Sequence, residues 1–391
     1  MRRRVWGWST VVLLIGVLAL SGCALNADGA APPGPTHSPA AKPPPGPPPP
    51  NDLGPERIAQ IVNDECPDAV TENSIRLLVQ PRAEAVDFFA STGQCADIPS
   101  VLRSGNGARP FVSPMQYIDG PCDAGTLFTV WAHYDDDLIF GAPTIPQALD
   151  AGKCVRNLYL TGSDAGSGLD YSAGREDGLR DSYGVLLGAP RDWVNRTVTL
   201  ADGIPVTISQ PVGNPRITLF FLRLPDGGLT GDGFDATGRE SLSKLLSGTL
   251  SELHTIDANA PVSLDALRAT VVELYNAYLP ETVLAHLPRS AVGSVGDHPD
   301  HQVTGEVVMT ATDAGQLDPA KVVYAQGYPS AERDMNLSGD VLQRKLEAFA
   351  AYAAHDSVIK CSTAETCAKR KKFGDWLQRQ YLIPHADIVR S

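Results

Sequence analysis

The sequence predicts an α/β protein in which helices cover a mainly parallel sheet. Apolar runs of strand length recur between residues 126 and 286, and they are continuous rather than alternating, as strands buried on both faces should be. Helical segments separate these runs, which is the order expected of parallel strands joined by crossovers. The chain has 391 residues and is 43% hydrophobic, which is enough for a sizeable core.

Each element follows from a local pattern. The expected strands are, in order, TLFTVWAH (126–133), VRNLYLTG (155–162), RITLFFLRLP (216–225) and TVLAH (282–286). The expected helices are 142–152, 173–188, 264–280 and a C-terminal helix that includes 344–357. Residues 196–209 are typical of a hairpin around Asp202-Gly203. The glycine-rich segment 161–168 follows the second strand directly.

The N-terminus is typical of an exported protein. Three arginines precede an apolar stretch, residues 11–20, which is followed by LSGC ending at Cys23. This resembles the lipobox of bacterial lipoproteins, in which the cysteine is lipidated. We therefore expect residues 1–23 to be a lipoprotein signal peptide and the mature protein to be extracytoplasmic, held on the bacterial cell membrane by acyl chains on Cys23. An ordinary secretory signal is the alternative.

Three further segments follow the signal peptide. Residues 24–54 are proline-rich and cannot build a core, so they predict a semi-rigid linker. Residues 55–120 show no clear pattern and are interpreted as an N-terminal extension packed on the main domain, which spans 121–391. The formal net charge of −13 argues against nucleic acid as a partner.

The cysteines suggest disulfides. The chain has seven, and lipidation of Cys23 would leave an even number in an exported chain. Cys361 and Cys367 close a short loop. Cys122 and Cys154 each precede a predicted strand and would meet at one sheet edge if those strands are neighbours. Elimination leaves Cys66 with Cys95.

Three polar clusters are expected at the carboxyl ends of strands, where ligands bind in such sheets. The first is His133 with the three aspartates 135–137, and the second is the glycine-rich segment 161–168. The third is GDHPDHQVTG (296–305), in which a spacing of three places His298 and His301 on one side of a helical turn. Pro299 suits the first turn of that helix.

These residue types point to a catalytic metal. His133, one aspartate and one later histidine form a two-histidine, one-carboxylate set that leaves a coordination position open. Of Asp135 and Asp136, one can bind the metal while the other acts as general base on water. A histidine near the open position could stabilise the oxyanion and protonate an amine leaving group, and Asp300 could orient an imidazole. A metal site, a general base and an oxyanion stabiliser together suit metal-assisted hydrolysis of an amide.

AHYDDD followed by DHPDHQVTG resembles the LmbE-like, or GlcNAc-phosphatidylinositol de-N-acetylase (PIG-L), family of metal-dependent N-deacetylases. The similarity extends over residues 120–330. It also includes the helix expected at 344–357, as in exported members of the family. It implies a Rossmann-like three-layer sandwich, with Zn²⁺ or another divalent metal such as Fe²⁺ as cofactor. The resemblance assigns the site residues as follows: His133, Asp136 and His301 as metal ligands, Asp135 as general base, and His298 as oxyanion stabiliser and proton donor. Tyr134 and the shorter Asp137 stand where the family has proline and glutamate.

Other polar residues are open to two interpretations. Asp164, Arg175 and Arg180 could contact substrate or belong to solvated surfaces. Four further histidines outside the motifs are interpreted as structural or surface residues; they are His254, His286, His355 and His385.

Together these predictions describe a zinc-dependent hydrolase that removes an acetyl or similar acyl group from an amino sugar or glycoconjugate. A metal amidase acting on peptide-like bonds is one alternative. A surface glycan-binding lipoprotein without activity is another, although the intact Asp135 argues against it.

Overall fold

The computed structural model describes residues 122–390, apart from 190–191, 201, 213 and 215. The signal peptide with Cys23, the proline-rich linker, the N-terminal extension and the pair Cys66–Cys95 lie outside the described residues. Among the described residues, no helix is both long enough and apolar enough to span a membrane.

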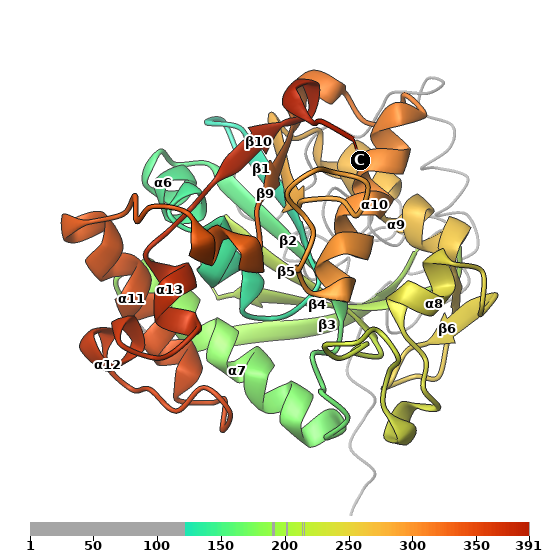
Figure 1. Ribbon diagram of the computed structural model, residues 1–391, viewed down its shortest axis with the longest axis horizontal. Coiled ribbons are helices and arrows are strands. Elements are labelled where there is room, and N and C mark those ends of the chain that lie inside the picture. The colour runs from blue at the N-terminus through green and yellow to red at the C-terminus, as the bar shows by residue number, and fades with distance from the viewer. Residues whose placement is uncertain (1–121, 190–191, 201, 213, 215, 391) are drawn as a thin grey trace, which may run out of the picture. The chain divides into compact units, whose positions relative to one another are not determined.

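An eight-stranded sheet runs through the centre of this part of the chain (Figure 1). Its strands are β1 Thr126–Trp131, β2 Cys154–Thr161, β3 Trp193–Thr199, β4 Pro205–Pro211, β5 Ile217–Leu224, β8 Thr282–His286, β9 Val322–Ala325 and β10 Leu382–Pro384. They are ordered β10-β9-β8-β1-β2-β5-β4-β3. The strands from β9 to β5 are parallel, whereas β10, β4 and β3 pair antiparallel. The predicted mainly parallel sheet is confirmed, and so is the predicted hairpin, which is β3–β4.

Helices cover both faces of the sheet, so the architecture has three layers. One face carries α6 Thr144–Asp150, α7 Leu169–Leu186, α11 Gly339–Ala353, α12 Ala364–Ala368 and α13 Phe373–Leu377. The other carries α8 Leu242–Leu246, α9 Leu264–Tyr278 and α10 Pro299–Asp313. A separate apolar core lies on each side of the sheet, which is why the central strands are buried on both faces.

Shorter elements complete the described chain. A π-helix, η1, spans Asp137–Gly141 directly after the first polar cluster. The 3₁₀ turns are η2 Asp235–Thr237, η3 Pro319–Lys321, η4 Tyr328–Glu332 and η5 His385–Asp387, and β6 Glu252–His254 pairs with β7 Pro261–Ser263.

The strand order reverses next to β1. From β1 the chain proceeds to β2 on one side, and it later returns to place β8 on the other side. At such a switch point the connections leave the sheet in opposite directions and open a crevice at the carboxyl ends of the strands. The residues that follow β1 and β8 therefore face a common space.

Two disulfides occur in the described residues. Cys122 is joined to Cys154, with Cα atoms 5.7 Å apart, because β1 and β2 are neighbours. Cys361 is joined to Cys367, with Cα atoms 5.1 Å apart, and ties the segment after α11 to α12. Both pairs were predicted from the sequence.

Candidate active site

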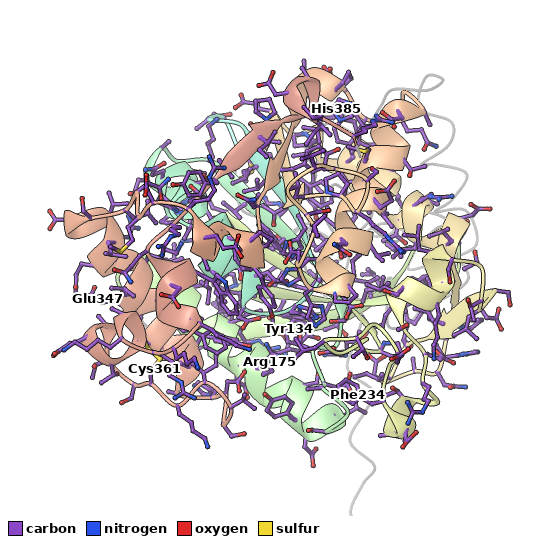
Figure 2. All side chains as sticks on the ribbon, viewed as in Figure 1. Tyr134, Arg175, Phe234, Glu347, Cys361 and His385 are labelled. Atoms are coloured by element: carbon purple, nitrogen blue, oxygen red, sulfur yellow. A yellow bond between two sulfur atoms is a disulfide. The ribbon has the colours of Figure 1, made fainter. Side chains whose placement is uncertain are left out.

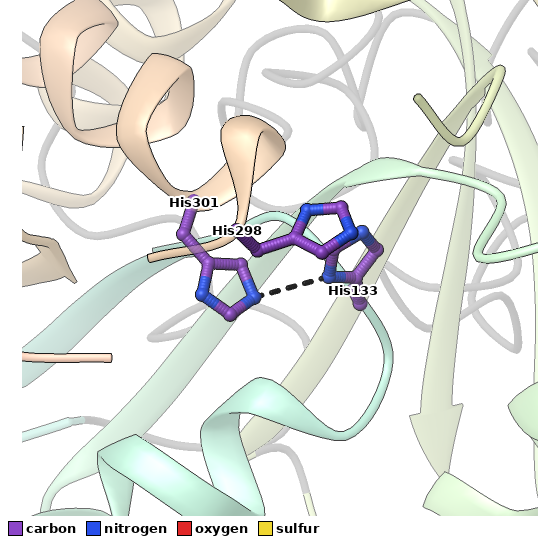
Figure 3. Close-up of side chains that lie close together, drawn as sticks. All are labelled: His133, His298 and His301. Carbon is purple, nitrogen blue, oxygen red and sulfur yellow. Dashed lines mark hydrogen bonds between the residues drawn. The ribbon is translucent and has the colours of Figure 1, made fainter. Parts of the chain in front are cut away.

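Two strand ends and the start of one helix position the polar residues of the site. His133 and Asp136 follow β1, and His286 is the last residue of β8. His298 is the N-cap of α10, and His301 lies in its first turn, on the same side. All five side chains are buried. Figure 3 shows the three histidines of the two sequence motifs converging on one point.

The three predicted metal ligands lie at the separations that one ion requires. His133 Nδ1 is 3.2 Å from His301 Nε2. The Asp136 carboxylate is 3.1 Å from His301 Nε2 through Oδ1 and 3.4 Å from His133 Nδ1 through Oδ2. Ligand atoms about 2.1 Å from a tetrahedral zinc ion lie about 3.4 Å from one another. The donor set therefore fits a small divalent cation.

The surroundings of the two imidazoles support the same conclusion. His301 Nδ1 lies 2.9 Å from Asp297 Oδ1, to which it donates. His133 has a carboxylate near each ring nitrogen: Nδ1 is 3.4 Å from Asp136 Oδ2, and Nε2 is 3.4 Å from Asp300 Oδ2 and 3.9 Å from Asp226 Oδ2. His133 Nδ1 and His301 Nε2 face each other at 3.2 Å, so a proton or a metal cation must lie between them.

The electrostatics of the site favour added positive charge. Burial lowers the pKa of His301, but Asp136 and then Asp297 raise it to about 9. Burial raises the pKa of Asp136, yet His301, His286 and His133 bring it well below its usual range. Asp136 is therefore a carboxylate at any physiological pH, as a metal ligand must be.

Other groupings of potential ligands overlap with this one. Side-chain donors lie within 4.8 Å of one another in three sets: His133, His298 and His301; His133, Asp226, His298 and Asp300; and Asp136, His286 and His301. His298 Nδ1 already accepts a hydrogen bond from the Asp300 backbone N–H at 3.2 Å. The His286 ring stacks on His301 with centroids 4.0 Å apart and planes at 5°, so the two rings do not aim at a common point. The set His133, Asp136 and His301, whose ligand atoms lie 3.1–3.4 Å apart, shares two members with the first of these sets and two with the third.

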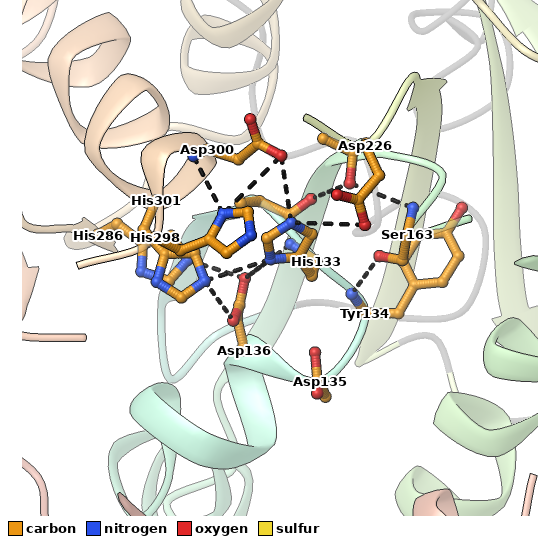
Figure 4. Close-up of polar contacts among 12 residues, drawn as sticks. His133, Tyr134, Asp135, Asp136, Ser163, Asp226, His286, His298, Asp300 and His301 are labelled. Carbon is orange, nitrogen blue, oxygen red and sulfur yellow. Dashed lines mark hydrogen bonds and ion pairs between the residues drawn. The ribbon is translucent and has the colours of Figure 1, made fainter. Parts of the chain in front are cut away.

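Asp135 is adjacent to Asp136, and both line the cavity described below. Figure 4 shows the Asp135 carboxylate apart from the ion pairs around Asp136. Its Oδ1 accepts a hydrogen bond from Arg175 Nη2 at 3.0 Å. Burial raises the pKa of Asp135, Arg175 lowers it and Asp136 raises it again, so that the pKa lies above the usual range. A raised pKa makes a carboxylate a stronger base, which suits proton transfer from water.

His298 is neutral and offers one N–H. Burial lowers its pKa well below the usual range, and the neighbouring His133 and His301 lower it further. Because Nδ1 accepts the Asp300 backbone N–H, the proton lies on Nε2. His298 also lines the cavity, so this N–H is a hydrogen-bond donor available to a bound ligand.

The two residues that depart from the family motif point away from the ligands. Asp137 is buried, and its Oδ2 accepts hydrogen bonds from Tyr159 at 2.9 Å and Tyr183 at 2.6 Å. The Tyr134 hydroxyl donates to Glu176 Oε1 at 3.2 Å. Both side chains lie on the α7 side of the sheet, so neither departure disturbs the ligand set.

Sequence reasoning missed three residues of the site. His286, interpreted as structural or surface, donates from Nε2 to Asp136 Oδ2 at 2.9 Å. Asp226 follows the β5 strand, and Asp297 directly precedes His298. Their position just after predicted strands or beside a motif histidine was the available signal. Asp297 depends on Gly327, because a Cβ there would collide with its carboxylate.

The three residues proposed for substrate contact have different positions. Arg175 lines the cavity. Arg180 does not line it and binds Glu176 Oε2 at 3.0 Å and Ser209 Oγ at 3.1 Å. Asp164 is also outside the lining and accepts the backbone N–H groups of Gly166 and Asp226. In the view of Figure 2, Arg175 lies between Cys361 and Phe234.

A cavity of about 310 Å³ opens above this group. It is lined by His133, Asp135, Asp136, Ile139, Ala165, Tyr171, Arg175, Asp226, Gly228, Leu229, Phe234, His298, Tyr328, Asp356, Val358, Ile359, Phe373 and Trp376. The general-base candidate and the donor N–H thus share one space with two of the three metal ligands.

The residues of this site lie within a match to a known family. Residues 128–312 match the PIG-L family, described as GlcNAc-PI de-N-acetylase. The match covers less than half of the chain and includes all of the motif residues. No curated protein matches the sequence.

Several solved structures are similar at low identity. N,N'-diacetylchitobiose deacetylase from Pyrococcus horikoshii is 16% identical, with a TM-score of 0.37 over 68% of this chain and 85% of that one. A deacetylase of teicoplanin biosynthesis is 12% identical, with a TM-score of 0.38 over 62% and 92%. The 4-carboxy-2-hydroxymuconate hydratase of Pseudomonas putida KT2440 is 12% identical, with a TM-score of 0.31 over 63% and 87%. The function must be argued from the site itself.

Proposed function

We propose that the protein is a divalent-metal-dependent hydrolase that removes an N-acetyl or similar acyl group from an amino sugar or glycoconjugate. The convergence of His133 Nδ1, the Asp136 carboxylate and His301 Nε2 within 3.1–3.4 Å carries this proposal. Zn²⁺ suits two imidazoles and one carboxylate, and Fe²⁺ would use the same donors. The match to a de-N-acetylase family over residues 128–312 supports an amide as the bond that is cleaved.

The bound metal would polarise the amide carbonyl and lower the pKa of water to about 7. Asp135, on the cavity side of the ligands, would take the proton from the attacking water. His298 would donate a hydrogen bond from Nε2 to the oxygen that becomes negative in the transition state. The leaving amine would then take its proton from His298, as predicted from the sequence, or from Asp135, which has just received one from water.

Asp300 is a positioning residue in this scheme. Its backbone N–H binds His298 Nδ1 at 3.2 Å, and its carboxylate lies 3.4 Å from His133 Nε2. One residue thus orients both imidazoles, which extends the role predicted from the sequence.

The experiment that tests the proposal combines metal analysis with a substrate screen. The purified protein should hold one divalent ion and release acetate from N-acetylated sugars or glycolipids. His301→Ala should lose the ion, whereas His355→Ala, which removes a contact with Asp181 outside the cavity, should keep it. Full metal stoichiometry in His301→Ala would refute the ligand assignment. A metal-bound wild type that releases nothing from any substrate would favour the glycan-binding alternative.

We also propose that the protein is exported and anchored to the bacterial membrane through Cys23. The two disulfides support export, since such bridges persist in oxidising compartments. Substrates would then be glycans or glycolipids at the cell surface, and nucleic acid would not be a partner. Replacing Cys23 with alanine should move the protein from the membrane fraction to the soluble fraction, and an unchanged distribution would contradict anchoring.

A further inference from the structure

The polar groups on the walls of the cavity are already bound to one another. Arg175 binds Asp135 at 3.0 Å and Asp356 at 3.2 Å. The Tyr171 hydroxyl donates to Asp356 Oδ1 at 2.8 Å. Among the described residues that line the cavity, Arg175 is the only lysine or arginine. A phosphate there would compete with two carboxylates for one guanidinium, so the cavity does not favour an anionic ligand.

A second side of the cavity is apolar and begins next to the metal ligands. Ile139 lies one turn after Asp135, whose carbonyl accepts its N–H at 2.9 Å. The Tyr328 ring is 5.0 Å from the His301 ring and stacks on Trp376 with centroids 4.1 Å apart. The indole N–H of Trp376 already donates to the Tyr328 carbonyl at 3.1 Å. Apart from the Tyr328 hydroxyl, these side chains offer apolar surface and no hydrogen-bonding group.

One further apolar lining residue is exposed to solvent. Val358 is 60% exposed although it lines the cavity, and it follows the end of α11. Its backbone N–H is held by Asp356 Oδ1 at 2.9 Å, and the Cys361–Cys367 disulfide closes the next loop. Because its backbone is held in this way, the exposed Val358 side chain adds apolar surface to the lining of the cavity and does not close the cavity.

We infer that the acyl group removed is a linear aliphatic chain longer than acetyl, of about four to eight carbons, each adding apolar burial. This rests on the proposed hydrolase function. The scissile carbonyl must sit at the metal ligands, and the two halves of the amide leave it in different directions. A neutral amino sugar fits toward the polar side, and the acyl chain fits along Ile139, Tyr328, Trp376 and Val358. Hydrolysis would join the water oxygen to the acyl carbon, break the C–N bond and place a proton on the nitrogen, releasing a carboxylic acid and a free amine.

An acyl-length series tests the inference on the zinc-loaded full chain. The substrates are methyl glycosides of glucosamine bearing N-acetyl, N-butanoyl, N-hexanoyl or N-octanoyl groups, with the released amine measured. We expect kcat/KM to rise about 10- to 100-fold from acetyl to hexanoyl, as burial of a few methylenes implies. Turnover that is greatest for acetyl would overturn the chain inference and leave the hydrolase proposal intact. If the zinc-bound protein releases amine from no substrate of the series, both the chain inference and the hydrolase proposal are overturned.

Two further substrates test whether an apolar group on the amine side, or an anionic group, increases turnover instead. The hexyl glycoside of N-acetylglucosamine places the apolar group on the amine side, and N-acetylglucosamine 6-phosphate adds an anion. A gain of tenfold or more for either compound, without a gain for the N-hexanoyl compound, would overturn the inference.

Matched surface variants locate the chain within the cavity. Val358→Asn should reduce the hexanoyl-to-acetyl ratio of kcat/KM at least threefold, because it replaces apolar surface along the chain. Leu229→Asn changes another exposed lining residue, on the segment after β5, and Val389→Asn changes an exposed valine outside the cavity. The hexanoyl-to-acetyl ratio of kcat/KM should be unchanged in both of these control variants. A ratio that falls in Leu229→Asn but not in Val358→Asn would overturn the assignment of the chain to this side.

Discussion

His286 should control how tightly the metal is held without being a ligand. Its Nε2 donates a fully buried hydrogen bond to Asp136 Oδ2 at 2.9 Å. A buried hydrogen bond to a charged group is worth about 1.5–3 kcal/mol. Removing the donor in His286→Leu should therefore weaken zinc binding about 10- to 100-fold, the range typical of such supporting residues. The loss of zinc affinity should not exceed this range, because the His133 backbone N–H still donates to the same Asp136 oxygen at 2.6 Å.

His286→Gln is the matched control, since its amide N–H can occupy nearly the position of Nε2. Competition against a fluorescent zinc chelator measures the affinities, with circular dichroism to verify folding. We expect Gln to stay within a few-fold of wild type and Leu to show the full loss at unchanged stoichiometry. Equal affinities for folded Leu and wild-type proteins would refute the reasoning. A stoichiometry of zero in both variants would instead make His286 a ligand.

Three further predictions concern catalysis, stability and the cysteines. Asp135→Asn should retain its metal and fold while losing about 10²–10⁴ of its activity; loss of metal would mean that Asp135 is itself a ligand. Burial lowers the pKa of Lys345 to about 7, so between about pH 7 and 10 the unfolded chain binds a proton that the folded chain lacks. The free energy of unfolding of wild type, relative to that of Lys345→Met, should therefore rise by up to about 1.4 kcal/mol per pH unit. Urea unfolding of both proteins at pH 7 and pH 9 measures this difference in stability. A difference that is the same at both pH values would contradict the prediction. Thiol labelling of denatured protein should find no free cysteine other than Cys23, and two or more reactive thiols would be inconsistent with the disulfides.

The fold was largely readable from the sequence because its strands are buried on both faces. Such strands must be continuously apolar, and this signal is local to each segment. The strand predictions 126–133, 155–162, 216–225 and 282–286 correspond to β1, β2, β5 and β8. Strands β9 and β10 were not predicted, because strands of four and three residues carry little apolar pattern of their own.

The convergence of the candidate ligands was also predictable, because they fall in two compact motifs. His133 and Asp136 leave one strand together, and His298 and His301 share one helical turn. The sequence could not show which way each carboxylate of 135–137 turns. The structure sends Asp135 to the cavity, Asp136 to the histidines and Asp137 to two tyrosines on the other side.

By itself the sequence determined the chemical types at the site, the order of the strands that carry them and both described disulfides. Only the tertiary structure decided which distant residues support them. His286 belongs to the site because β8 pairs with β1, Val130 opposite Ala285, which brings the last residue of β8 level with the residues before His133. Nothing in TVLAH indicates this, since the pairing of distant strands depends on how the whole chain buries its apolar surface. The apolar side of the cavity has the same origin: residues 328–376 reach the metal ligands only through the packing of the C-terminal helices against η1 and α7.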